Sequence, residues 1–346
     1  MKKITTIYDI AERLNLTAST VSRALNGSNK ISEATRQLVN DTAAEMNYQQ
    51  NFFAKALKTG RSFNVGVIVP RIDIDFFGSV IRGIAEELNP YGYNVIISQT
   101  YDNGQLEEEN INSLLNIQVD GIFMSISNSD VDNTKVFDDT SKKNVPFIFF
   151  DRKKDIKGIS TITVDDYKGA YLGTKHLIDQ GCQRIAYFTN NHLLQIFKNR
   201  FLGYKQALED HHIEFDESLI VEVPLSVIEG RKKTKQLLQK KQPPDAIFAV
   251  HDYPALGAIQ EIKANGLRVP EDICVVGFSN EPFTQFMELP ITTIDQSPLE
   301  MGRIAAKIFL ENIKNKSKKI KSEKHVVLTP ELIIRKSSLR SNINTN

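Results

Sequence analysis

A short polar run near the start of the chain has the residue types and spacing needed to contact a DNA duplex. If residues 18–25 form a helix, Val21 and Leu25 lie on its inner face and Ser19, Ser22 and Arg23 lie on its outer face. A guanidinium group can donate two parallel hydrogen bonds to O6 and N7 of guanine, and a serine hydroxyl can donate or accept. The run therefore predicts a short helix that reads base edges in the major groove.

The elements around this run are those of a helix-turn-helix. Thr6, Thr17 and Ser32 are each placed to cap the first turn of a helix, because their hydroxyl oxygens can accept a hydrogen bond from a backbone amide. Only Asn15 and Leu16 precede Thr17 in the turn that joins the first two helices. Residues 1–50 are therefore expected to form a small all-α domain.

The charge of the chain is distributed unevenly along its length. Residues 1–60 carry eight basic and five acidic residues, a net charge of +3, whereas residues 61–310 carry 26 and 34, a net charge of −8. A basic head can lie against a polyanion while phosphate repels an acidic body. The lysine-rich stretch 314–324 has no aromatic or helical organisation, so a solvated loop is favoured there over a nucleic-acid patch.

From residue 64 onward, short apolar runs alternate with segments of helical periodicity, a pattern typical of parallel α/β folds. The expected strands are residues 65–69, 94–98, 121–125, 147–150, 184–188, 246–250 and 273–277. The expected helices are residues 77–88, 107–117, 167–180, 200–210, 229–239, 255–265 and 299–312. So many units exceed one ordinary sheet, which predicts two α/β lobes with a cleft between them; a closed eight-fold barrel is the alternative.

Composition and length exclude several classes of protein. A chain of 346 residues with 41% hydrophobic and 25% charged residues is expected to be globular, with more than one compact unit. No apolar run approaches the ~20 residues of a transmembrane helix, and the start of the chain lacks the apolar segment of a signal peptide. Cys182 and Cys274 form no Cys-x-x-Cys pair. We therefore expect a cytoplasmic protein without a metal or another cofactor.

Ordered motifs occur in both parts of the chain. The head and linker contain TIYDIAERLNLTASTVSRALNGSNKISEATR, Tyr48 and NFFAKALKTGRS, and the body contains VGVIVP, FFGSVIRGI, FFDR, NRFLGYKQAL and PDAIFAVHDYPALGAIQEIKANGLRVPEDICVVGF. From residue 4 to about residue 336 the chain resembles the LacI/GalR family of transcriptional regulators. The resemblance implies a two-lobed α/β core of the periplasmic-binding-protein type, with parallel sheets, and a small all-α helix-turn-helix N-terminal domain.

The resemblance also implies how the chain is divided. Residues 1–50 would form the DNA-binding domain, 51–61 a hinge helix and linker, 62–337 the effector-binding and dimerisation core, and 338–346 a tail. Within the core, the N-lobe would hold residues 62–160 and 293–323, and the C-lobe residues 161–292 and 324–337.

Carried over position by position, the resemblance assigns base reading to Ala18, Ser19 and Arg23. Arg23 would supply most of the specificity, because Ala18 offers only a methyl group and Ser19 an ambivalent hydroxyl. Phosphate contacts are expected from residues near helix ends, which are Thr6, Thr20, Ser22, Asn26 and Ser32. In the hinge, Leu57 holds the position of the family's minor-groove wedge, with Ala54 beside it. Gln50 stands where the family usually has proline, so packing of paired hinges is less constrained.

The family binds a small molecule, often a sugar, between its lobes. The positions that match its ligand contacts are Phe76, Phe77, Asp151, Arg200, His251, Asp252, Ser279 and Asn280. Aromatic rings stack on apolar sugar faces, and planar polar groups bind hydroxyls. Two positions depart from the pattern, because Ser279 stands where many members have an aspartate and His251 where asparagine is frequent. The ligand of a known member therefore cannot be carried over.

The leading hypothesis is a sequence-specific DNA-binding regulator, with repression as its expected action, that binds a palindromic operator as a homodimer under control of a carbohydrate-like effector. An enzyme acting on a sugar or nucleotide is the second hypothesis, but neither G-x-G-x-x-G after the first strand nor G-x-x-x-x-G-K-[ST], G-x-S-x-G or H-E-x-x-H is present. A two-lobed sugar-binding transport protein is the third, but it would need an export signal and no DNA-binding head.

Overall fold

The computed structural model describes residues 5–48, 60–129, 131, 135–137, 140, 143–190, 194–314 and 323–340. The chain divides into two compact units, Met1–Ser62 and Phe63–Asn346, which are described separately below. Within the described residues, no helix has the length and apolarity needed to cross a membrane.

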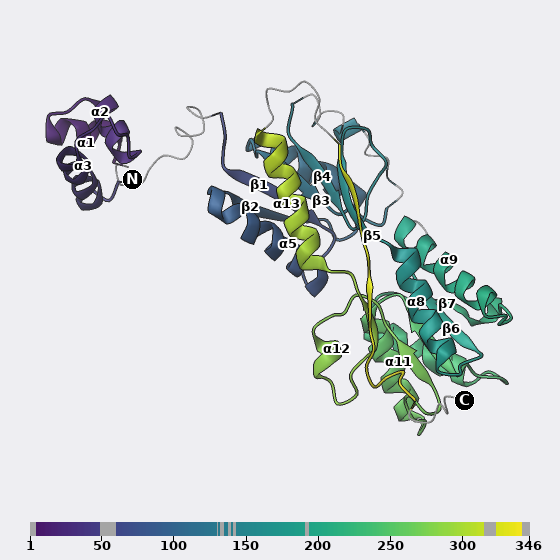
Figure 1. Ribbon diagram of the computed structural model, residues 1–346. Helices are drawn as coiled ribbons and strands as arrows, with labels where there is room; N and C mark the ends of the chain where they lie inside the picture. Colours follow the sequence, from purple (N-terminus) through teal and green to yellow (C-terminus); the bar gives the residue numbers. More distant parts are fainter. Residues whose placement is uncertain are drawn as a thin grey trace. The chain divides into compact units, whose positions relative to one another are not determined.

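The first unit is a three-helix domain, as expected, with α1 at Ile7–Leu14, α2 at Ala18–Leu25 and α3 at Glu33–Glu45 (Figure 1). Local side-chain caps define where the helices begin. Thr6 and Asp9 form a reciprocal capping box on α1, and Thr17 and Ser32 each accept a hydrogen bond from the third backbone amide of their helix. The helices enclose a small apolar core of Ile10, Ala11, Val21, Ala24, Val39 and Ala43.

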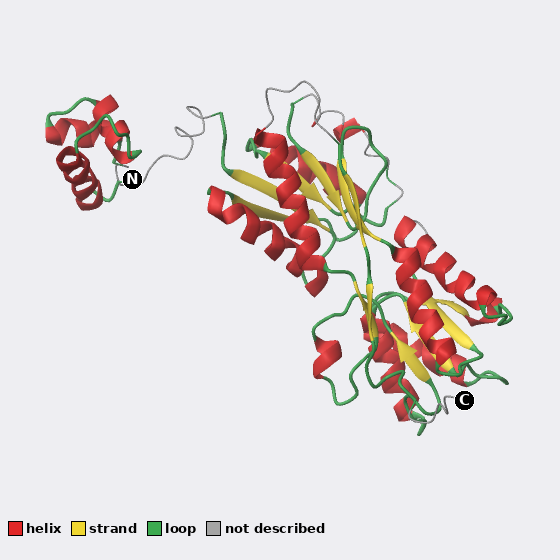
Figure 2. Cartoon of the chain, viewed as in Figure 1, coloured by secondary structure: helices red, strands yellow, loops and turns green. Residues whose placement is uncertain are grey.

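The second unit contains two separate parallel sheets flanked by helices (Figure 2). The prediction of two α/β lobes is therefore confirmed, and the alternative of a closed barrel is wrong. The N-lobe sheet has the order β11-β5-β4-β3-β1-β2. Its strands are β1 Asn64–Val69, β2 Asn94–Gln99, β3 Gly121–Met124, β4 Phe147–Phe150, β5 Ser160–Val164 and β11 His325–Leu328. The C-lobe sheet, of order β7-β6-β8-β9, contains β6 Ile185–Thr189, β7 Ile220–Glu222, β8 Ala246–Ala249 and β9 Cys274–Val276.

The helices cover these sheets in both lobes. In the N-lobe, α5 at Asp75–Leu88 packs beside α13 at Pro298–Lys314 (Figure 1), and α6 spans Gly104–Asn116. The C-lobe carries α8 Asp166–Asp179, α9 Gln195–Asp210, α10 Val227–Leu238, α11 Asp252–Ala264 and the short α12 Phe283–Phe286. Single turns of 3-10 helix lie at Asn89–Tyr91 and Glu217–Leu219. All seven expected helices of the body are confirmed.

The expected lobe boundaries at residues 161 and 324 are corrected by the structure. One strand after each boundary, β5 and β11, was expected in the C-lobe but belongs to the N-lobe. Strand β5 pairs with β4, and β11 pairs with β5 at the edge, so both strands belong to the N-lobe sheet. The segment Ser160–Val164 is rich in serine and threonine, and β11 has only three consecutive apolar residues, beside the lysine-rich stretch, so neither matched the longer apolar runs used to identify strands. Between the lobes, β10 Thr293–Asp295 pairs antiparallel with β12 Glu331–Ile333.

Candidate DNA-reading surface and ligand cleft

Helix α2 presents a polar outer surface that centres on Arg23. Val21 and Ala24 are fully buried in the core of the head, which turns Ser19 and Arg23 outward to solvent. Among the described residues, the Arg23 guanidinium has no ion pair and no side-chain hydrogen bond. It is therefore available for an external acceptor such as a guanine edge.

The two other residues expected to read bases are less available. The methyl group of Ala18 is half-buried and packs against the core of the head. The Ser19 hydroxyl lies 2.9 Å from the Thr17 hydroxyl, which also contacts Thr20. Of the three expected base-reading residues, Arg23 is thus the one whose polar group projects freely.

The residues expected to contact phosphates are largely capping residues. Thr6 and Ser32 lie at the amino ends of α1 and α3, where backbone N–H groups point outward and attract anions. The Thr20 hydroxyl is 2.9 Å from Thr17, and the Asn26 amide donates a 2.6 Å hydrogen bond to the carbonyl oxygen of Ser22. These hydrogen bonds hold the two ends of α2 in place, and a phosphate group would meet the backbone at these ends. Ala54 and Leu57 of the expected hinge lie outside the described residues.

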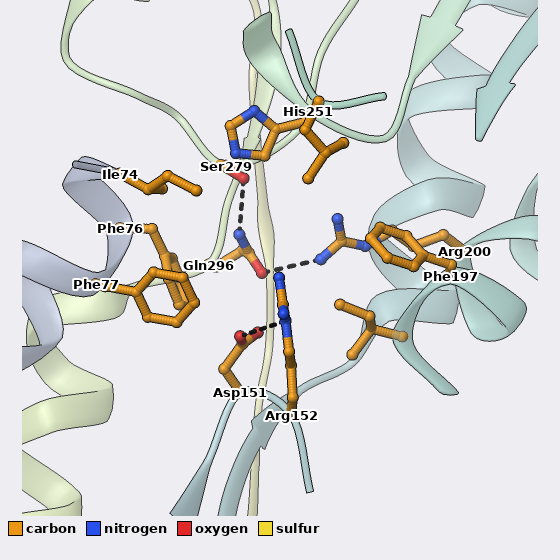
Figure 3. Close-up of a pocket in the computed structure, with 12 residues that line it drawn as sticks. Ile74, Phe76, Phe77, Asp151, Arg152, Phe197, Arg200, His251, Ser279 and Gln296 are labelled. Atoms are coloured by element: carbon orange, nitrogen blue, oxygen red, sulfur yellow. Dashed lines mark hydrogen bonds and ion pairs between the residues drawn. The ribbon is translucent and has the colours of Figure 1, made fainter. Parts of the chain in front are cut away.

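A cavity that opens to solvent lies in the second unit and draws its lining from both lobes; about 370 Å³ of empty space, part of it open solvent, lies between its lining atoms. Figure 3 shows the phenyl rings of the first turn of α5 facing Phe197 and Arg200 of α9 across it. The lining residues are Ile74, Phe76, Phe77, Asp151, Arg152, Ile196, Phe197, Arg200, Leu225, His251, Ser279 and Gln296. Such a mixture of apolar walls and a few convergent polar groups is typical of small-molecule sites.

Six of the eight expected ligand residues line this cavity, and two do not. The buried Asp252 carboxylate accepts hydrogen bonds from the backbone amide of Glu281 at 2.8 Å and the hydroxyl of Thr293 at 2.6 Å. The Asn280 amide donates to Asp295 at 2.6 Å and accepts from Arg335 at 2.8 Å. Both side chains are turned toward the strand between the lobes, where they hold the 279–281 loop in place.

Sequence reasoning missed half of the lining. Arg152 directly follows Asp151, Phe197 lies one helical turn before Arg200, and Gln296 follows β10. Neighbouring positions and the helical repeat could have suggested the first two. Ile74, Ile196, Leu225 and Gln296 carry no such signal, because their position depends on how the two lobes meet.

Arg200 is the most constrained polar group of the cavity, with 3% of its surface exposed. Its Nε donates to Asp166 at 2.7 Å, and its two terminal nitrogens donate to the Val250 carbonyl at 2.8 Å and to Gln296 at 3.2 Å. The guanidinium also lies 3.6 Å above the ring of Phe278. Burial raises the pKa of Asp166 to about 6 even though Arg200 lowers it.

A second arginine pair lies on the N-lobe side. Arg152 donates to Asp102 at 2.8 Å, and its Nε lies 3.6 Å from Asp151. Asp151 also accepts a 3.1 Å hydrogen bond from the hydroxyl of Ser125. Burial raises the pKa of Asp151, although Arg152 and Arg200 oppose that shift.

His251 contributes a neutral ring to the cavity. Burial, together with the positive charges of Arg200, Arg152 and Arg71, lowers its pKa to about 3. The ring stacks on Tyr253 at a centroid distance of 5.4 Å, and its Nδ1 accepts a hydrogen bond from the backbone amide of Tyr253. At neutral pH the imidazole is therefore uncharged, and it can form hydrogen bonds without adding a charge to the cavity.

Comparisons with known proteins find matches for both compact units of the chain. Residues 6–51 match the family described as bacterial regulatory proteins, lacI family, and residues 174–338 match a periplasmic binding protein-like domain. The HTH-type transcriptional regulator DegA of Bacillus subtilis is 31% identical over 341 residues, which cover 99% of each chain. The ribose operon repressor of Haemophilus influenzae is 30% identical over 96% of this chain and 98% of its own.

Solved structures show the same architecture. The lac repressor dimer bound to operator and the anti-inducer ONPF has a TM-score of 0.86 at 26% identity, covering 98% of this chain and all of that one. The transcriptional regulator CelR in complex with cellobiose has a TM-score of 0.72 at 26% identity, covering 96% and 99%. The chain therefore belongs to the LacI family of bacterial regulatory proteins and is a DNA-binding transcriptional regulator, not an enzyme.

Proposed function

We propose that this protein represses transcription by binding a palindromic operator as a homodimer, and that a small carbohydrate-like effector in the cleft controls this binding. The observation that carries the proposal is the presence, in one chain, of an outward Arg23 on α2 and of a polar and aromatic cavity lined by both lobes. Among similar structures, the lac repressor is bound to its operator and CelR is bound to cellobiose. Such a regulator acts in the cytoplasm, where the DNA lies.

The short length of the DNA-reading helix α2 is the reason to expect a dimer. Helix α2 has eight residues and reaches few base pairs, so two half-sites must share the recognition. On the core, the phenyl ring of Phe286 is 80% exposed, which suits burial against a second copy.

In the hinge, Leu57 and Ala54 would contact the minor groove, with the leucine acting as a wedge between base steps. Ligand-driven movement of the lobes would then separate the paired hinges and release the operator.

The test of operator recognition compares Arg23→Ala with Arg13→Ala. Arg13 is also exposed on the head but pairs with Glu45 at 2.7 Å, so its loss removes the same charge away from the reading face. Operators are first selected from genomic fragments with the intact protein. Arg23→Ala should then lose about 1–3 kcal/mol of discrimination between operator and random duplex, while salt-dependent nonspecific binding persists. Unchanged discrimination in Arg23→Ala would contradict its proposed role.

A further inference from the structure

The two cysteines of the chain lie beside each other in the C-lobe, although they are far apart in the sequence. Cys182 precedes β6 and Cys274 begins β9, and both are buried free thiols. The Sγ atom of Cys182 lies 3.8 Å from the carbonyl oxygen of Asp245, which also accepts a 3.0 Å hydrogen bond from the Cys274 amide. Around this shared oxygen the two thiols come within hydrogen-bonding reach of each other. Contact between the sulfur atoms is the first requirement for a disulfide.

The surroundings make the two thiols chemically unequal. The hydrogen bond to Cys274 raises the pKa of Cys182, because the donor of that bond must keep its proton. The same hydrogen bond lowers the pKa of Cys274, and the positive charge of Arg340 lowers it further, although burial opposes both. Cys274 therefore becomes a thiolate, the nucleophilic form of cysteine, more readily than Cys182 does. The pair thus combines an attacking sulfur with a protonated neighbour.

A short segment after β12 lies against the pair. The Sγ atom of Cys274 is 3.7 Å from the carbonyl oxygen of Ser338. Two residues later, the guanidinium group of Arg340 donates hydrogen bonds to the carbonyl oxygens of Gln180 and Asp245 at 3.2 and 3.4 Å. These bonds are long and the Arg340 side chain is partly exposed, so they open more readily than the ladder of the sheet. Movement of this side chain is the route by which we expect a small oxidant to reach the thiols.

The pair lies at the end of the C-lobe sheet opposite to the ligand cavity. Asp245 directly precedes β8 and Cys274 begins β9, which is parallel to it. His251 and Ser279, which line the cavity, follow the carboxyl ends of the same two strands. A covalent bond between the cysteines would therefore leave the cavity unobstructed. Chemistry at the pair does not depend on the proposed effector.

We infer that Cys182 and Cys274 form a redox-active pair that hydrogen peroxide converts into a reversible disulfide. The Cys274 thiolate attacks one peroxide oxygen and becomes a sulfenic acid, while the O–O bond breaks and the released hydroxide takes up a proton to form water. The Cys182 sulfur then attacks the Cys274 sulfur. The S–S bond forms, and the sulfenic hydroxyl leaves with the Cys182 proton as a second water. The two sulfur atoms together lose the two electrons that the peroxide gains, and a thiol reductant reverses the reaction by exchange.

The first test treats the folded wild-type protein with an excess of hydrogen peroxide, removes the peroxide with catalase, and alkylates the free thiols in denaturant. The number of alkylated cysteines should fall from two to none. Proteolytic mapping without reductant should find the peptides of Cys182 and Cys274 joined, and dithiothreitol should restore both thiols. Persistence of both thiols after overnight treatment would overturn the inference. A link between two chains, or sulfinic acid in place of the disulfide, would overturn it as well.

The second test compares Cys182→Ser with Cys274→Ser in the presence of peroxide and dimedone, which traps sulfenic acids. Cys182→Ser keeps the attacking sulfur and lacks the thiol that would displace the hydroxyl, so its sulfenic acid should accumulate. Labelling of Cys274 in this variant should exceed labelling of Cys182 in Cys274→Ser several-fold. Any other pattern would overturn the assignment of Cys274 as the attacking thiol. The wild-type experiment tests the disulfide itself, and it stands even where a variant folds poorly.

Discussion

Arg200 combines a place in the ligand cavity with a structural role, because its ion pair with Asp166 is buried on both sides. Removing one partner of such a pair leaves the other charge buried and uncompensated. A loss of ligand response in an Arg200 variant therefore has to be separated from a loss of stability.

We predict that Arg200→Ala lowers the free energy of unfolding of the core by about 3–5 kcal/mol and blunts the effector response while sparing DNA binding. The control is Arg82→Ala, whose pair with Glu86 at 3.2 Å is exposed on both sides and should contribute less than about 1 kcal/mol. Urea unfolding curves measure both changes. Equal losses of unfolding free energy in the two variants would show that the buried ion pair contributes no more than the exposed pair. A normal effector response in Arg200→Ala would remove Arg200 from the site.

Glu281 should make the stability of the core depend on pH. Its pKa is about 7 in the folded protein against 4.5 for an ordinary glutamate, so the folded state keeps a proton that the unfolded state has lost. The contribution is full below pH 4.5 and is lost as the pH rises through 7. His251 acts in the opposite sense, because its lowered pKa removes stability as the pH falls from 6.5 toward 3.

Glu281→Gln should therefore gain stability relative to the wild type as the pH rises from 4.5 to about 7, by up to about 3 kcal/mol. His251, Asp252 and Asp75, which face Glu281, are present in both proteins, so most of their own titration cancels in the comparison. Thermal denaturation at half-unit pH steps measures the difference. Parallel stability curves for the two proteins would contradict the prediction.

At the scale of elements, glycines determine how closely the helices pack. In the N-lobe, a Cβ atom at Gly83 of α5 would overlap the carbonyl oxygen of Leu299, and one at Gly302 of α13 would overlap that of Val80. Backbone atoms cannot turn aside as a side chain can. The contact between α5 and α13 therefore depends on these two residues having no side chain.

Gly83→Ala is expected to lower the free energy of unfolding by about 1–3 kcal/mol, because the added methyl group pushes α5 away from α13. Gly78 lies in the same helix, and a Cβ there has no heavy atom within 4 Å. Gly78→Ala should raise stability by about 0.5–1 kcal/mol through helix propensity alone. Chemical denaturation distinguishes the two, and a Gly83→Ala protein as stable as Gly78→Ala would show that the helices can separate without cost.

The 279–281 loop connects the cavity to the strands that run between the lobes. Ser279 lines the cavity and accepts a 3.1 Å hydrogen bond from Gln296, which itself follows β10 between the lobes. Asn280 binds Asp295 and Arg335, at the ends of β10 and β12. A ligand that moves Ser279 therefore acts on the strands through which the chain passes from lobe to lobe.

At the scale of the whole molecule, the proposed homodimer would bring two reading helices to one operator. Phe286→Asp should shift the protein toward monomer at micromolar concentration, because a charge replaces an exposed ring that a partner would bury. Operator affinity should fall with it, while effector affinity is retained. Leu202→Asp, at an exposed apolar residue of α9, is the control. Sedimentation velocity measures both, and dissociation of the Leu202 variant alone would place the interface elsewhere.

The sequence by itself determined the head and most elements of the body. Thr6, Thr17 and Ser32 each accept a hydrogen bond from the amide three residues later, and apolar repeats depend only on their own segment, so a linear sequence shows both signals. The six expected ligand residues that line the cavity came from the family resemblance, which preserves positions along the chain.

Only the tertiary structure decided which polar groups face the cavity and what neutralises them. Asp166 and Arg200 are 34 residues apart, and Glu281 meets the first turn of α5 from another lobe. The same packing turned Asp252 and Asn280 toward β10 and assigned β5 and β11 to the N-lobe sheet. Strand order and lobe contact determine these neighbours, and neither leaves a local pattern in the sequence, because each depends on the burial of surfaces that are distant along the chain.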